Sequence, residues 1–143
     1  KARAGADRIQ KPLLVVGEPD GEYPCGDVLV DLRPTSVCPN YVKADVQNLS
    51  MFQDKQFGAV FCSHLLEHID DPQRGLAELH RVADQVFIAY PRPWRLATWI
   101  VPGHQWLVFR DTSNPDGLRF VKHPVLHGRK SYPTRYGTAL GHP

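Results

Sequence analysis

Short apolar runs at close spacing are the feature that most constrains how this chain can fold. Runs of four to six mainly apolar residues with little polar alternation are typical of strands in a parallel sheet, because both faces of such a sheet are covered. A shorter run at 41–44 predicts one further strand. The main runs are Leu13–Val16, Val28–Leu32, Phe57–Cys62 and Gln85–Tyr90.

The clearest helix signal is the triplet Asp70-Asp71-Pro72. An aspartate can accept hydrogen bonds from the first N–H groups of a helix, and a proline at the first helical position has its φ already set. The sequence therefore predicts a helix from Pro72 to about Val82. Weaker patterns predict a helical segment at 94–101, strands at 106–109 and 118–122, and a short helix or a loose arm at 1–11.

The links between the first three predicted strands are about ten residues or shorter, although a parallel crossover with a helix needs a dozen or more. The chain therefore predicts an α/β fold: a Rossmann-like, mostly parallel sheet of about five to seven strands with helices missing between the first three strands. One sheet face would then need cover from the amino-terminal segment, the carboxy-terminal tail or a second copy. On this ground we expect a homodimer.

Composition sets broad limits on function. The length of 143 residues predicts a single domain, 1–143, with an irregular tail at 111–143. The near balance of 17 basic and 15 acidic residues argues against nucleic-acid binding driven by overall net charge. We expect a cytoplasmic protein without a membrane partner, because no apolar run is long enough to span a bilayer and no secretory leader is visible. The three cysteines lack metal-site spacing, so free thiols and no metal are predicted.

The segment from Ala44 to Pro91 resembles the class I S-adenosylmethionine-dependent methyltransferases of the group called type 11. Three linked patterns carry the resemblance: Ala-Asp-Val-Gln-Asn-Leu at 44–49, the strand at 57–62 entering Leu-Leu-Glu-His-Ile-Asp-Asp-Pro at 65–72, and Leu-Ala-Glu-Leu-His-Arg-Val at 76–82. The resemblance implies S-adenosylmethionine as cofactor, S-adenosylhomocysteine as product, and methyl transfer to an acceptor that the sequence does not identify. It favours a small-molecule acceptor over nucleic acid.

The same resemblance implies roles for particular residues at the carboxyl ends of the strands, where open α/β sheets bind ligands. Asp31 would accept hydrogen bonds from the ribose, and Asp45 would accept one from the adenine amine. His64 is the first candidate for a general base, with His104 as a weaker second. The complete set of expected cofactor-binding residues is Gly17, Glu18, Gly21, Asp31, Leu32, Asp45, Val46, Cys62 and Ser63.

The first loop departs from the family pattern of an acidic residue followed by alternating glycines. Val15 stands at the acidic position and Pro19 at the central glycine, so the loop is degenerate and the amino-terminal half is shortened. Proline fixes φ and removes an N–H, which changes the shape of the loop. An alternative function is therefore a catalytically inactive methyltransferase fold that serves as a binding or assembly module.

Two other classes are consistent with local patterns. His64-Leu65-Leu66-Glu67-His68 matches the H-x-x-E-H pattern of inverted zinc peptidases, in which two histidines on one helix face bind zinc. That mechanism needs a downstream glutamate ligand, and Glu78 is the last glutamate in the chain. Nucleic-acid binding is suggested by basic and aromatic residues of the tail, which include Arg119, Phe120, Lys122, Arg129, Lys130, Tyr132, Arg135 and Tyr136.

Overall fold

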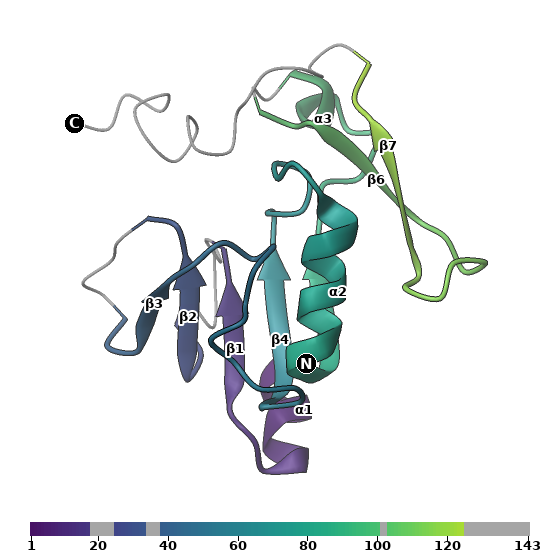
Figure 1. Cartoon of the computed structure of the whole chain (residues 1–143). Coiled ribbons are helices and arrows are strands. Elements are labelled where there is room, and N and C mark those ends of the chain that lie inside the picture. The colour runs from purple at the N-terminus through teal and green to yellow at the C-terminus, as the bar shows by residue number, and fades with distance from the viewer. Residues whose placement is uncertain (18–24, 34–37, 101–102, 125–143) are drawn as a thin grey trace.

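The computed structural model describes residues 1–17, 25–33, 38–100 and 103–124 (Figure 1). Five parallel strands form one sheet in the order β3-β2-β1-β4-β5, and β6 and β7 form a separate antiparallel pair. This arrangement confirms the predicted Rossmann-like α/β fold. The sheet strands are β1 (Leu13–Val16), β2 (Val28–Asp31), β3 (Tyr41–Lys43), β4 (Phe57–Ser63) and β5 (Ala83–Ala89).

Helix α2 (Pro72–Val82) begins and ends where the sequence predicts. Asp71 is its N-cap, and the Asp71 side chain accepts a hydrogen bond of 3.0 Å from the backbone N–H of Arg74. Pro72 occupies the first helical position, as its preset φ favours. The chain passes from α2 directly into β5 at Ala83, two residues earlier than predicted.

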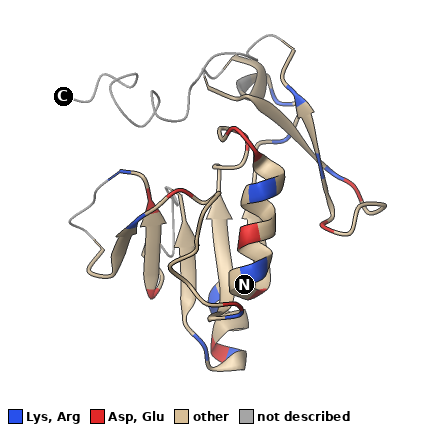
Figure 2. Cartoon of the chain, in the orientation of Figure 1, with Lys and Arg blue, Asp and Glu red and all other residues tan. Residues whose placement is uncertain are grey.

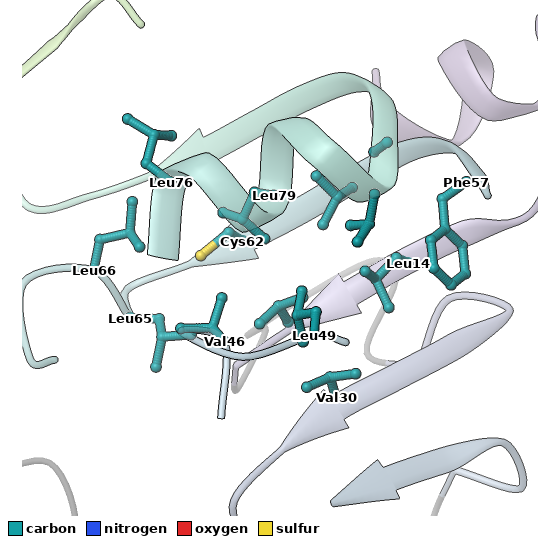
Figure 3. Packing of buried hydrophobic residues seen from close by; sticks show 14 of the residues in the cluster. Leu14, Val30, Val46, Leu49, Phe57, Cys62, Leu65, Leu66, Leu76 and Leu79 are labelled. Carbon is teal, nitrogen blue, oxygen red and sulfur yellow. The ribbon is translucent and has the colours of Figure 1, made fainter. Parts of the chain in front are cut away.

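The larger core lies between α2 and one face of the sheet (Figure 3). Alternate residues of the strands point to this face, including Leu14, Val30 and Cys62. Leu76 and Leu79 of α2 pack against them and are fully buried. Burial of side chains of this size contributes about 1.5–3 kcal/mol each relative to exposure, so this packing stabilises α2 against the face of the sheet.

The opposite face is covered by helix α1 (Ala2–Ile9) and by residues near β2 and β3. Ala2 and Ala6 of α1 join Leu13, Val15 and Ala59 in a second buried cluster. The described residues between β1 and β3 contain no helix, so the short connections leave this face of the sheet without a crossover helix. The amino-terminal helix α1 covers the face in its place. We expected a homodimer because this sheet face would otherwise lack cover. Since α1 covers it, the homodimer stays a prediction for which the sheet face is no longer a reason.

Cys25 and Cys38 form a disulfide bond, so the prediction of three free thiols is wrong for this pair. The two cysteines lie just before β2 and β3, which are neighbours in the sheet. Pairing of those strands brings together two residues that are 13 positions apart. Cys62 is the free cysteine and is buried in the core.

Helix α3 (Leu96–Ile100) and the hairpin of β6 (Trp106–Arg110) and β7 (Leu118–Lys122) lie beyond the carboxyl ends of β4 and β5 (Figure 1). Strand β7 falls within 111–143, so the first part of the expected irregular tail is regular structure. Residues 125–143 lie outside the described part of the chain. Among the described residues, every helix is too short or too polar to cross a bilayer.

Candidate functional site

Gly17 marks the carboxyl end of β1, at the centre of the sheet. Its φ of +84° is a left-handed conformation that side chains rarely adopt, and its N–H donates to the carbonyl of Val30. A Cβ placed on Gly17 would lie 3.2 Å from the carbonyl oxygen of Ser63 and 3.3 Å from Cβ of Leu65. Glycine therefore allows the backbone after β1 to pass close to the end of β4.

Asp31 ends β2, the strand next to β1, and is buried. Its Oδ1 accepts a hydrogen bond of 2.8 Å from the backbone N–H of Arg33, which sets the carboxylate in the turn after the strand. The carbonyl of Asp31 accepts from the Tyr41 hydroxyl and from the N–H of Ala44. The side chain of Leu32, also predicted at the cofactor site, packs partly buried against the larger core.

Asp45 follows β3 and turns the chain back toward the sheet. Its Oδ1 accepts hydrogen bonds from the backbone N–H and from the side-chain amide of Gln47. Gln47 in turn accepts from the N–H of Asp71, the N-cap of α2. The Asp45 turn is thus joined to the start of α2. Val46 is buried in the core beside Gly75 of α2, and its expected place beside the adenine stays a prediction.

The end of β4 presents Cys62, Ser63 and His64 in succession. Cys62 is buried on the α2 face, and burial, with the nearby Glu67 as a second cause, raises the pKa of its thiol. Ser63 is buried beside Gly17. His64 leaves the strand with a φ of +49° and a side chain that is 54% exposed, and its N–H donates to the carbonyl of Ala89 in β5.

These positions lie on one edge of the sheet because the strands are parallel and paired in register. Val16 is opposite both Val30 and Cys62, so the residues that follow β1, β2 and β4 are neighbours. Figure 2 shows acidic residues after β2, after β3 and before α2 along this edge. Glu18 and Gly21, the remaining predicted cofactor residues, lie outside the described residues.

A family model agrees with this geometry. Residues 28–85 match a methyltransferase domain. The match runs from β2 through α2 into β5 and covers 58 of the 143 residues. Together with the parallel sheet, it confirms the resemblance to class I S-adenosylmethionine-dependent methyltransferases. No curated protein and no solved structure shows a match to the chain.

The turn after β4 differs from the helix that the peptidase alternative requires. Residues 64–71 form turns and bends, and His64 has a left-handed φ, so His64 and His68 do not share a helix face. Within this segment the N–H of His68 donates to the carbonyl of Leu65, which closes a single turn. The H-x-x-E-H pattern therefore lacks the helical geometry on which zinc binding by the two histidines depends.

Glu67, His68 and His104 form a buried cluster beside His64. Oε1 of Glu67 lies 3.4 Å from Nδ1 of His64 and 3.9 Å from Nε2 of His68. The rings of His68 and His104 are 4.8 Å apart between centroids. Nothing in the spacing of His104 and the H-x-x-E-H pattern places His104 against Glu67, which lies 37 residues earlier in the chain. The cluster links the turn after β4 to the start of the β6–β7 hairpin.

Proposed function

We propose that this protein transfers a methyl group from S-adenosylmethionine to a small-molecule acceptor. The methyltransferase-domain match and the class I fold support this activity, and the places of Gly17, Asp31 and Ser63 at the carboxyl ends of β1, β2 and β4 support its location. The acceptor class rests on the resemblance and on the near balance of basic and acidic residues. Fold alone does not specify an activity, so the residues at the strand ends must carry the proposal.

The backbone at Gly17 is the single observation that carries the proposal. The chain after β1 approaches the end of β4 so closely that a Cβ would contact backbone there, and the φ of +84° favours glycine independently. This turn stands at the carboxyl ends of the strands, where open α/β sheets bind ligands. Asp31, on the neighbouring strand end, supplies a buried carboxylate that suits ribose hydroxyl groups.

Within this proposal the protein mainly positions the reactants. Bound S-adenosylmethionine supplies an electrophilic methyl group, and an in-line transfer depends strongly on orientation. Asp31 holds the ribose, and Gly17 and the turn after β4 define where the methyl group and the acceptor meet. His64, with an exposed side chain next to Ser63, accepts the proton that the acceptor loses.

Calorimetric titration of the full chain with S-adenosylmethionine and S-adenosylhomocysteine tests this function. Asp31→Ala should weaken binding roughly 10- to 100-fold, since hydrogen bonds to a charged group contribute about 1.5–3 kcal/mol. Asp7→Asn on α1 is the matched control, because its exposed side chain lies on the other side of the molecule. Equal affinity of wild type and Asp31→Ala would contradict the ribose assignment, and absence of binding to wild type would contradict the proposed function. Binding without transfer to any acceptor would favour the inactive binding module.

A further inference from the structure

Glu67 is buried in an environment that does not satisfy its carboxylate. The side chain is fully buried, and neither Oε1 nor Oε2 accepts a hydrogen bond from any described residue. The nearest ring nitrogens, Nδ1 of His64 at 3.4 Å and Nε2 of His68 at 3.9 Å, lie close to Oε1 without making a hydrogen bond to it. A buried carboxylate without hydrogen bonds is costly, and native proteins place such groups against a donor, a counter-ion or a metal ion. This residue therefore points to something that binds at its oxygens.

Two histidines beside Glu67 are oriented as metal ligands are. Nδ1 of His68 lies 2.8 Å from the carbonyl oxygen of Gly103, and Nδ1 of His104 lies 2.8 Å from the carbonyl oxygen of Thr98. A carbonyl only accepts, so each Nδ1 carries the proton and donates it. The Nε2 atoms are then the nitrogens that can bind a cation. A hydrogen bond from the opposite ring nitrogen to a backbone carbonyl is the usual support of a metal-binding histidine.

The spacing of the three groups also suits a shared ion. One ligand atom from each of Glu67, His68 and His104 can be chosen so that all lie within 4.8 Å of one another. An imidazolium paired directly with Glu67 would bring nitrogen and oxygen to about 2.7–2.9 Å. The distance from Nε2 of His68 to Oε1 of Glu67 is 3.9 Å. Ligand atoms around tetrahedral Zn²⁺ lie roughly 3.3 Å apart, given metal–ligand distances of about 2.0–2.1 Å. Binding would therefore bring the His68–Glu67 pair closer by about 0.6 Å and the widest pair by up to about 1.5 Å.

We propose that Glu67, His68 and His104 bind one divalent transition-metal ion, with Zn²⁺ as the preferred ion. Two imidazoles and one carboxylate are a donor set that zinc accepts, and three protein ligands leave one tetrahedral position for water or a further ligand. This site goes beyond the proposed methyl transfer and does not depend on it.

The position of the ion gives it a structural role. Glu67 and His68 belong to the turn after β4, whereas His104 belongs to the loop before β6. Backbone hydrogen bonds already join these segments, because the carbonyl of Glu67 accepts from the N–H groups of Gln105 and Trp106. An ion bound by both segments fastens the β6–β7 hairpin to the carboxyl edge of the parallel sheet.

Metal analysis of the untagged full chain tests the proposal. After equilibration with Zn²⁺ and removal of excess ion, wild type should retain one zinc per chain, and Co²⁺ in its place should give the visible absorption of a tetrahedral site. Glu67→Gln and His104→Gln should each weaken zinc binding at least tenfold, by analogy with losses measured for supporting residues of metal sites. His80→Gln, which alters an exposed histidine of α2, should leave zinc content unchanged.

Circular dichroism of each zinc-free variant separates loss of a ligand from loss of the fold. A folded Glu67→Gln or His104→Gln chain that retains zinc as tightly as wild type would overturn the proposal, as would a wild-type chain that retains none. If one ligand variant fails to fold, the other decides. If both fail, the wild-type zinc content and the cobalt spectrum decide, because a site with these ligands must show both.

Discussion

Loss of the Cys25–Cys38 disulfide should destabilise this protein substantially. The bond joins residues 13 positions apart, and closing a loop of about 14 residues lowers the entropy of the unfolded chain by roughly 10 cal/mol/K, or about 3 kcal/mol at 25 °C. Domains of this size are stable by about 5–15 kcal/mol in total, so the bond supplies a large part of the margin.

The perturbation is the double variant Cys25→Ala/Cys38→Ala, measured by urea unfolding. For an m-value near 2 kcal/mol/M, a loss of about 3 kcal/mol moves the unfolding midpoint down by about 1.5 M. Reducing agent should shift wild type by a comparable amount and leave the double variant unchanged, because Cys62 is then the remaining cysteine. The disulfide lies at the amino ends of β2 and β3, so it stabilises the fold from the side opposite to the ligand edge.

Thiol counting tests the same reasoning independently of stability. Alkylation of unfolded, unreduced wild type should modify one cysteine, Cys62, and alkylation after reduction should modify three. Three modified cysteines before reduction would refute the disulfide. A midpoint shift below about 0.5 M in a chain that does contain the bond would instead refute the loop-entropy calculation.

Three further substitutions probe the core, the turn after β1 and the pH dependence of stability. Leu79→Ala removes a fully buried α2 side chain and should cost about 2–5 kcal/mol in urea unfolding. Gly17→Ala should cost about 1–2 kcal/mol for its left-handed φ and should also weaken S-adenosylmethionine binding in calorimetry, because its Cβ would approach Ser63. The hydrogen bond from Arg81 lowers the pKa of Glu78 below its ordinary value of 4.5. The stability that this pair contributes is thus complete above pH 4.5 and is lost as the pH drops through the pKa of Glu78 in the folded protein. The free energy of unfolding of Glu78→Gln should therefore depend less on pH in that range than that of wild type.

The local elements of this fold could be predicted because short-range physics determines them. Asp71 and Pro72 define the start of α2 by capping and a preset φ, and the apolar run at 13–16 requires burial on both faces. The start of β5 at Ala83 was missed because no turn residue separates it from α2. A helix that runs directly into a strand leaves no local signal at the boundary.

The remaining features depend on contacts between distant residues. Cys25 meets Cys38 because β2 pairs with β3, and neither cysteine has neighbours that indicate a partner. His104 reaches Glu67 because the loop before β6 returns to the turn after β4. The residues at the ends of β1, β2 and β4 were predicted to lie together because parallel pairing requires it. The hydrogen-bond partners of each of these side chains could not be predicted, because their spacing in the sequence does not determine which atoms they meet.

Hydrogen exchange with and without saturating S-adenosylhomocysteine tests most directly whether the carboxyl edge of the sheet is the ligand site. We expect slower exchange in peptides that contain Gly17, Asp31 and His64, with little change in α1 and in the tip of the β6–β7 hairpin. Protection confined to those other regions, or no change in exchange anywhere, would contradict it.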